Sequence, residues 1–427
     1  MNRSALVLAA MCAVAGLLGA QTVAITGGKV YPVSGPPIEG GTVLMRDGKI
    51  VAVGKEVAVP SDAQRVDATG KWVTPGLVNS YTSLGFGDVG FSGGPRELSA
   101  KGHDGIAAGF QVWLGFNTQS TMIAPAREGG VTSAVASPAG GLVSGQAAIV
   151  DLSGALPLTD VLVKAPATMV AQIEDNESAK VGATGEAVGV LRDLIEDTKA
   201  YMRRKSDFER AQTRPFVGTR RDLEAMIPVV EGREPLTITA DQAAEIREAL
   251  KIAKDYGIKV VILGGAEAWM LADRIAEAKV PVLTGAMNNI PGSFSTLGSR
   301  QENAGLLRKA GVQVGIIGNA GGGDEELFNI RNLRYEAGNA VAYGMSWDDA
   351  LRAVTLAPAE IYGVADRVGS LKAGTEGNVV IWSGDPFQLS SRAEQVFVRG
   401  KKIDTPSRQD LLTKRYEKLP PTYESEH

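Results

Sequence analysis

Short strand-like patterns dominate both ends of the chain. Residues 22–30 (TVAITGGKV) and 42–53 (TVLMRDGKIVAV) are rich in strand-forming apolar residues, and Asp47-Gly48 is a strong hairpin signal inside the second run. Further runs of this kind occupy residues 64–73, 368–371, 378–382 and 396–403. Because chain termini often lie close together in space, we expect both groups to form one small β-domain, with the rest of the chain inserted between them.

The middle of the chain alternates between strand-like and helix-like segments. The strand-like segments are residues 130–137, 161–163, 236–239, 259–263, 280–283 and 312–317. The helix-like segments are residues 187–204, 240–256, 266–278 and a stretch ending at residue 310. Gly257 and Gly311 provide stop signals for two of these helices. Such alternation predicts the α/β class.

The N-terminal residues have the pattern of an export signal. Asn2-Arg3 gives a short positive start, residues 5–18 are apolar, and Gly19-Ala20 offers small residues for cleavage. The run is too short and too rich in alanine for a membrane span, although an uncleaved anchor is the alternative. We therefore expect a periplasmic or secreted protein. Cys12 is the only cysteine, so the mature chain would have no disulfide and no thiol nucleophile.

Composition excludes some partners. The 427 residues, 44% of them hydrophobic and 22% charged, allow a large core and a second domain. A net charge of -4 without a clustered basic face argues against nucleic acid, and we expect no membrane contact after signal cleavage. Residues 172–234 mix basic runs such as Arg203-Arg204-Lys205 with acids. A solvated helical face is the preferred interpretation there, and an anionic partner site is the alternative.

One stretch carries a family resemblance. Residues 73–85 (VTPGLVNSYTSLG) predict a buried strand after the Pro75-Gly76 turn, with Tyr81 and Ser83 on the same face. The stretch resembles the strand that opens the barrel of the amidohydrolase superfamily, whose motif is apolar-x-Pro-Gly-apolar-apolar-Asp-x-His-x-His. Other runs resemble the imidazolonepropionase-like branch, particularly its exported bacterial members: residues 126–145, 240–269, 332–371 and 376–386. The resemblance covers nearly the whole chain after the signal.

The resemblance implies a fold and an activity. The expected fold is α/β, a (β/α)8 TIM-like barrel inserted in a small β-sandwich domain formed from both chain ends. The implied divisions are a signal at residues 1–20, the β-sandwich at 21–75 and 368–403, the barrel at 76–367 and a tail at 404–427. The family hydrolyses amide and related non-peptide C–N bonds of small molecules, with zinc or another divalent metal.

The metal positions implied by the resemblance have lost their ligands. The family places histidines at four positions and a metal-bound aspartate, which is also the general base, at a fifth; here these are Tyr81, Ser83, Thr239, Gly264 and Asn319. A bridging carboxylated lysine has no clear counterpart: Lys164 is the nearest candidate, and ordinary packing is its preferred interpretation. A catalytic zinc needs about three protein ligands, yet the chain has only two histidines, His103 and His427.

The expected consequence is a loss of catalysis. Without a metal, water keeps a pKa near 15.7 rather than about 7, so no hydroxide nucleophile forms. The amide of Asn319 also cannot accept a proton as a carboxylate can. We therefore expect no cofactor and a non-catalytic exported paralogue. Its expected partners are a catalytic amidohydrolase relative, a second copy of itself, or a small molecule.

An active hydrolase with a relocated or metal-independent site is the alternative. Carboxylates near predicted strand ends could bind a hard ion such as Mg²⁺ or Ca²⁺; they are Asp88, Asp241, Glu267, Asp324 and Glu325. For Asp241 and Glu267, capping of the following helices is the preferred interpretation. His103-Asp104 could act as a base pair, although an exposed loop histidine is preferred. Neither interpretation identifies a substrate, because specificity depends on the barrel loops.

Overall fold

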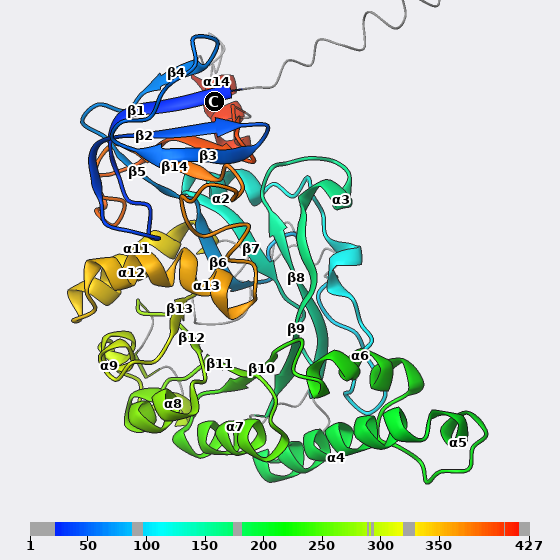
Figure 1. The fold of residues 1–427 in the computed structure, drawn as a ribbon. Helices are drawn as coiled ribbons and strands as arrows, with labels where there is room; N and C mark the ends of the chain where they lie inside the picture. Colours follow the sequence, from blue (N-terminus) through cyan, green and yellow to red (C-terminus); the bar gives the residue numbers. More distant parts are fainter. Residues whose placement is uncertain are drawn as a thin grey trace, which may run out of the picture.

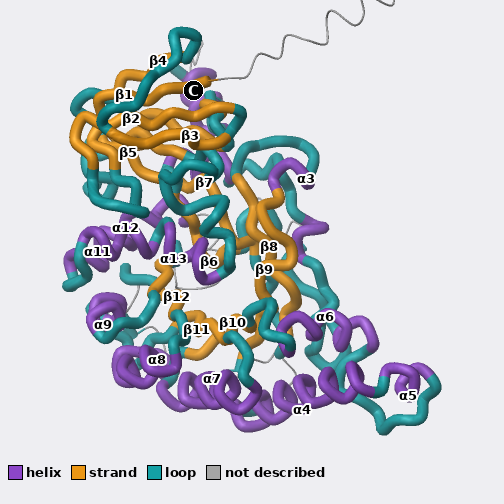
Figure 2. The backbone as a smooth tube through the Cα atoms, in the orientation of Figure 1, coloured by secondary structure: helices purple, strands orange, loops and turns teal. Residues whose placement is uncertain are grey.

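The computed structural model describes residues 22–87, 97–173, 182–287, 290–291, 294–318, 329–404 and 406–417. Several sequence predictions fall outside these ranges: the export signal with Cys12, and the candidate residues Asp88, Asn319, Asp324, Glu325 and His427. Two sheets organise the described residues, one at the top of the molecule and one below it (Figure 1 and Figure 2). Among the described helices, none is both long and apolar enough to cross a membrane.

Both ends of the chain contribute to the first sheet, in the order β16-β15-β14-β5-β1-β2-β3 with β4 beside β1. Its strands are β1 (Thr22–Val30), β2 (Ile38–Arg46), β3 (Lys49–Gly54), β4 (Gln64–Asp67), β5 (Trp72–Pro75), β14 (Val379–Trp382), β15 (Ala393–Val398) and β16 (Lys401–Lys402). The contact between the two ends is the antiparallel pairing of β14 with β5. The prediction that the two groups of strands share one sheet is therefore confirmed.

One predicted strand of this group is wrong. Residues 368–371 form no strand; Gly369 has a φ of +93°, and the Leu371 N–H donates to the Pro32 carbonyl at 2.9 Å. Val368 and Leu371 are buried, which explains the strand-like apolar pattern. Burial alone does not specify a strand when the backbone must turn at a glycine.

The second sheet is a nearly closed barrel in the order β13-β12-β11-β10-β9-β8-β7-β6. Its strands are β6 (Leu77–Thr82), β7 (Val131–Ala136), β8 (Val143–Asp151), β9 (Leu162–Gln172), β10 (Leu236–Ala240), β11 (Val260–Gly264), β12 (Val282–Thr284) and β13 (Val314–Ile316). The Ser80 hydroxyl donates to the Ile316 carbonyl at 3.3 Å, joining the first strand to the last. The predicted α/β fold, a TIM-like barrel with a separate β-domain, is confirmed.

The barrel departs from a purely parallel one at β8. This strand pairs antiparallel with both β7 and β9, so it runs against the other seven. Residues 152–161, a loop that ends in the single-turn helix α3 (Leu158–Val161), connect β8 to β9. A short connection of this kind joins antiparallel strands, whereas a parallel pair needs a longer crossover.

Helices cover the outside of the barrel. They are α2 (Ile123–Glu128), α4 (Thr184–Arg203), α5 (Lys205–Glu209), α6 (Arg220–Val230), α7 (Ala243–Tyr256), α8 (Ala272–Ala278), α9 (Asn303–Lys309), α11 (Leu333–Ala342), α12 (Trp347–Ala353) and α13 (Leu356–Ile361), followed by α14 (Arg408–Tyr416). Short 3₁₀ turns occupy Val112–Gly115, Ala268–Leu271, Phe294–Thr296 and Asn329–Asn332. The helix predicted at residues 266–278 is thus a 3₁₀ turn followed by α8. Gly257 ends α7 in the left-handed conformation, as predicted.

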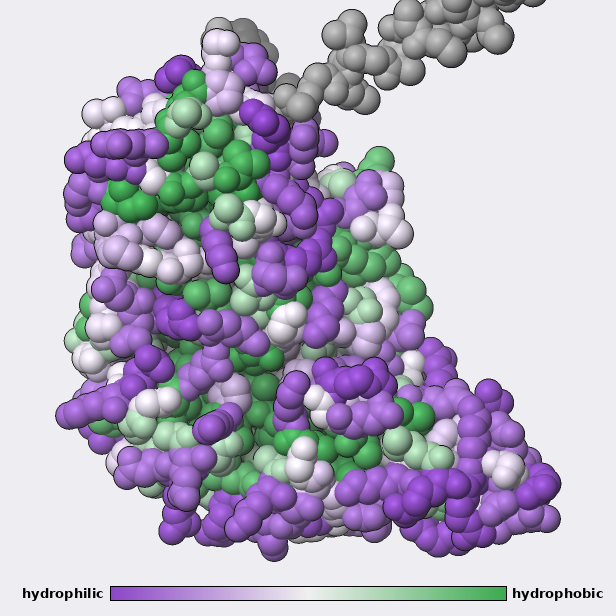
Figure 3. Space-filling view, viewed as in Figure 1, coloured by the Kyte–Doolittle hydropathy of each residue, from purple (hydrophilic) through white to green (hydrophobic). Residues whose placement is uncertain are grey.

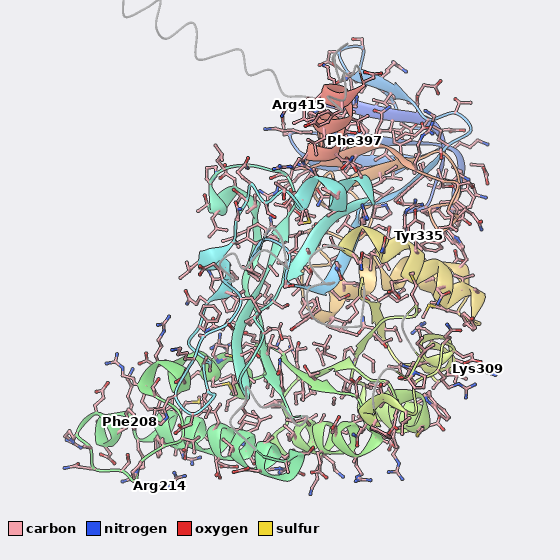
Figure 4. All side chains as sticks on the ribbon, turned by 180° about the vertical axis from the view of Figure 1, so that it is seen from behind. Phe208, Arg214, Lys309, Tyr335, Phe397 and Arg415 are labelled. Carbon is pink, nitrogen blue, oxygen red and sulfur yellow. The ribbon has the colours of Figure 1, made fainter. Side chains whose placement is uncertain are left out.

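Helices α4, α5 and α6 project away from the β-domain. Figure 4 shows Phe208 and Arg214 at one extreme of the molecule and Phe397 and Arg415 at the other. Figure 3 shows mainly hydrophilic residues over this projection and over α7. Five basic residues of the projection form local ion pairs: Arg204 and Arg210 with Asp207, Lys205 and Arg220 with Glu224, and Arg214 with Asp197. This pairing favours the solvated-face interpretation of the segment.

The Pro75-Gly76 turn leads from the first sheet into the barrel. A Cβ on Gly76 would lie 2.0 Å from the Thr132 Oγ1, so only glycine allows β6 to approach β7 this closely. Just before the turn, Thr74 accepts a hydrogen bond from the Trp382 indole at 2.9 Å. The motif therefore serves packing at the junction of the two sheets.

Candidate functional site

Three side chains face the barrel interior near the carboxyl ends of the strands, where sites form in barrels of this type. They are Tyr81 of β6, Thr239 of β10 and Leu263 of β11. Tyr81 and Leu263 belong to the apolar cluster that fills the barrel, together with Val135 and Leu283. Thr239 pairs in register with Leu263 and lies two residues after the inward Thr237. We call these three residues the mouth set.

The hydroxyl of Tyr81 is occupied by a protein contact. It donates to the Pro138 carbonyl at 3.2 Å, and the side chain is only 8% exposed. Ser83, the second position of the degenerate pair, is also buried, at 6% exposure. The sequence places both residues on the opening strand; the structure has Tyr81 within β6 and Ser83 one residue beyond its end at Thr82.

On β11, the structure places Leu263 rather than Gly264 on the interior face. Val261 and Leu263 lie in the interior cluster, whereas Val260 and Ile262 pack in the outer cluster against the helices. Gly264 has a φ of +92°, and a Cβ there would lie 2.5 Å from Asp241 Oδ1. The run 260–263 is entirely apolar, so no polar alternation in the sequence marks its inward face. Leu263 was therefore missed by sequence reasoning.

The carboxylates beside the mouth cap backbone groups. Asp241 Oδ1 accepts from the Ala266 N–H at 3.1 Å, and Glu267 Oε2 accepts from the Ala243 N–H at the start of α7 at 2.8 Å. Glu245 Oε2 accepts from the Asp241 and Gln242 N–H groups at 2.9 and 3.0 Å. Burial is the main cause of a raised pKa at Asp241, which Glu267 raises further. Both carboxylates therefore bind backbone N–H groups, but not those of the helix that follows each of them: Asp241 holds the loop after β11, and Glu267 holds the start of α7. The prediction that each caps the helix after it is wrong in its partner, because the two loops lie side by side and exchange these contacts.

Lys164 and His103, the other candidates in the described part of the chain, are not brought to the mouth. Lys164 lies at the start of β9, the end opposite the mouth, where its ammonium donates to the Tyr362 carbonyl at 2.8 Å. Burial lowers the pKa of Lys164. His103 is 62% exposed and lies 3.4 Å from Asp104, consistent with the exposed-loop interpretation. The lower barrel interior is closed by Tyr362, whose hydroxyl donates to the Ser80 carbonyl at 3.0 Å.

The described residues do not fit the divalent metal that the family uses. Within the described ranges, no group of three or more His, Cys, Asp or Glu side chains is placed to hold a metal ion. The mouth set offers two hydroxyls and an alkyl group, and neutral hydroxyls are poor zinc ligands beside imidazole, thiolate or carboxylate. Nothing in this donor set activates a water molecule.

Comparisons with known proteins agree with the fold. The sequence family described as Amidohydrolase family matches residues 262–405. The imidazolonepropionase of Acidiphilium cryptum is 25% identical, over 82% of this chain and 88% of its own length. That of Bradyrhizobium diazoefficiens is 27% identical, over 81% and 87%. Among solved structures, an amidohydrolase from Thermotoga maritima has a TM-score of 0.80 and 27% identity, covering 90% of this chain and all of the other. The chain is an imidazolonepropionase-like member of the amidohydrolase superfamily, as its barrel, its paired chain ends and these relatives indicate.

Proposed function

We propose that this chain is a non-catalytic, exported member of its superfamily that acts by binding, either as the partner subunit of a catalytic relative or as a receptor for a small molecule. The observation that carries the proposal is the mouth set. Tyr81 and Thr239 stand at positions where the resemblance implies imidazoles, and the inward side chain next to Thr239 on β11 is the alkyl group of Leu263.

The chemistry of the mouth set supports binding over hydrolysis. Hydrolysis of an amide requires an activated water and a base to take its proton. The Tyr81 hydroxyl donates a hydrogen bond to a backbone carbonyl, and the Leu263 side chain has no polar atom. The carboxylates next to the mouth, Asp241 and Glu267, accept backbone N–H groups instead of facing a substrate. An apolar interior with a few hydroxyls suits recognition of a small amide or lactam.

Metal content and turnover, measured on the same preparation, test this proposal. The mature protein is expressed with zinc, manganese or iron, desalted, and analysed by inductively coupled plasma mass spectrometry. It is then assayed against N-acyl amino acids, proline-containing dipeptides and cyclic amides. The expected result is far less than one metal per chain and no hydrolysis above the uncatalysed rate. The imidazolonepropionase of Acidiphilium cryptum, prepared identically, serves as the positive control.

Stoichiometric metal together with turnover would overturn the proposal. Turnover without metal would favour a relocated site, and Asp241→Asn and Asp324→Asn variants would then show whether either carboxylate carries it. Co-expression with a relative whose opening strand retains His-x-His tests the partner role, with a stable heteromer on size-exclusion chromatography as the expected result. N-terminal sequencing of the protein recovered from the periplasm tests export, with a new terminus near residue 21 expected.

A further inference from the structure

A groove of about 1040 Å³ lies on the barrel face opposite the mouth. One side of it is formed by the residues that immediately precede four successive parallel strands, β10 to β13: Pro235, Lys259, Pro281 and Gln313. Its walls are the second half of α7 and the end of α8, which lie side by side below β10, β11 and β12 (Figure 1). The groove therefore shares no residue with the mouth set and is a separate feature of the barrel.

The groove is strongly basic in a chain whose net charge is -4. Six cations line it: Arg247, Lys251, Lys254, Lys259, Arg274 and Lys279. Only two carboxylates, Glu277 and Glu360, share the lining, and Glu360 is already paired with Arg352. We call these six residues the groove cations.

Within the part of the chain that the structure describes, the groove cations have no ionic partner. None of the six forms an ion pair or a side-chain hydrogen bond with another residue of the described part of the chain. Asp255, on the same helix, pairs instead with Arg192 at 2.9 Å. By contrast, Arg308 pairs with Asp349 and Arg367 with Glu376. The groove thus gathers positive charge that the rest of the fold does not neutralise.

The spacing of these cations disfavours a purely structural role. Arg247, Lys251 and Lys254 follow one another at i, i+4 and i+7, so they lie on one face of α7 and repel each other. Favourable interaction with the negative end of a helix extends only over the last turn. That interaction accounts for Lys254 and Lys279 but not for Arg247, Lys251 or Arg274.

The floor of the groove is apolar. Ile258, Val260 and Val280 are each at most 5% exposed, and Leu250 and Ile361 are partly exposed beside them. An apolar floor rimmed by cations matches a ligand that has both an apolar body and acidic groups. The volume is also in the range of small-molecule sites rather than of extended protein interfaces.

We propose that this groove binds a small polyanion with an apolar body, of the nucleoside polyphosphate type, in which the groove cations contact the acidic groups and the floor contacts the body. The site is independent of the barrel mouth and of whether the mouth hydrolyses anything. Lysine and arginine are the side chains that proteins use for phosphate groups.

Isothermal titration calorimetry with three probes in EDTA-containing buffer tests this site. ATP supplies charge and an apolar base, inorganic triphosphate supplies charge alone, and adenosine supplies the base alone. The expected order of affinity is ATP above triphosphate, with no detectable binding of adenosine. Lys251→Ala/Arg274→Ala should weaken ATP binding at least tenfold. The matched control Lys55→Ala/Arg65→Ala removes the same charge from the exposed β-domain surface and should leave affinity within twofold.

Two results would overturn the proposal. One is the absence of ATP binding; the other is an equal loss in both double variants, which would show non-specific attraction. Co-sedimentation with phosphatidylglycerol vesicles distinguishes a lipid surface as the source of the acidic groups: vesicle binding without ATP binding rejects the small-molecule site. Circular dichroism melts confirm that each variant is folded, and Arg247→Gln/Lys251→Gln replaces the first pair if that pair lowers the melting temperature.

Discussion

At the scale of single residues, Glu234 is the clearest source of pH dependence. Its side chain is 4% exposed, and burial raises the pKa of its carboxyl to about 7, against an opposing effect of Lys164. The ordinary value for this group is 4.5. Between pH 4.5 and 7, Glu234 is therefore protonated in the folded state and ionised in the unfolded chain. The stabilisation that this difference represents is fully present below pH 4.5. This contribution is lost as the pH rises through 7.

Glu234→Gln should remove that pH dependence. A shift of about 2.5 pKa units corresponds to at most about 3 kcal/mol, so the wild-type protein should lose up to this amount between pH 5 and 8 relative to the variant. Urea unfolding at several pH values measures the difference. Glu56→Gln, at an exposed position, is the matched control and should follow the wild type. Parallel curves for Glu234→Gln and the wild type would contradict a buried, protonated Glu234.

The sequence predicts which side chains face the barrel interior where a motif defines the start of the strand, as in β6. It does not where the strand has no such motif, as in β11. Tyr81 was placed on the opening strand because Pro75-Gly76 sets its start, and its inward direction follows from the period of two. On β11 the run 260–263 is apolar on both faces, so nothing distinguished Leu263 from its neighbours. The sequence predicts that Asp241 and Glu267 cap the helices that follow them, whereas each binds a backbone N–H group of the other's segment, a contact between distant residues that has no local signal.

At the scale of elements, β14 is joined to β8 by a buried polar network. Asn378 Nδ2 donates to Asp151 Oδ1 at 3.0 Å and to the Ser133 hydroxyl at 3.2 Å, and its carbonyl accepts from the Arg399 N–H at 2.8 Å. Asp151 is fully buried and pairs with the Arg399 guanidinium at 2.7 Å. An amide suits position 378 because it is donor and acceptor at once.

Asn378→Asp should destabilise the protein, because it replaces a donor to Asp151 with a second carboxylate about 3 Å away. We expect a loss of about 1–3 kcal/mol in the free energy of unfolding, larger at pH 8 than at pH 5. Asp151→Asn added to Asn378→Asp restores one donor and one carboxylate, and should recover part of the loss. Chemical denaturation of the two single variants and the double variant forms a cycle that measures the coupling. Additive effects would contradict the network.

Element prediction from sequence was best for strongly patterned segments. The strand at 22–30 agrees with β1, and the helix ending before Gly257 agrees with α7. Strand β8 was missed because VSGQAAIVD has a glycine and a glutamine and little alternation, and its neighbours suggested a parallel barrel. Its antiparallel direction depends on pairing with β7 and β9, which are contacts distant in sequence and carry no local signal.

At the scale of the whole molecule, folding depends on bringing both chain ends into one sheet. β14 pairs with β5, and β5 leads directly into β6 of the barrel. An aromatic cluster of Tyr31, Trp72 and Trp347 packs across this junction, with ring centroids 4.7 to 5.5 Å apart. The sequence supported this organisation because each end carried short strands that could not bury their apolar faces alone.

Truncation from the C-terminus should therefore have a sharp threshold. Ending the chain after residue 404 removes α14, which buries none of its residues, so the melting temperature should stay within about 3 °C of the full chain. Ending it after residue 377 removes β14, β15 and β16, which form one side of the sheet, and with them Val379, Ile381 and Phe397 of its apolar cluster. The rest of that cluster is uncovered, and β5 becomes an edge strand. That shorter chain should be found in the insoluble fraction, because an exposed apolar edge strand promotes aggregation. Scanning calorimetry and soluble yield compare the two truncations with the full chain. A cooperative, unshifted melt for the chain ending at residue 377 would show that the barrel folds without the shared sheet.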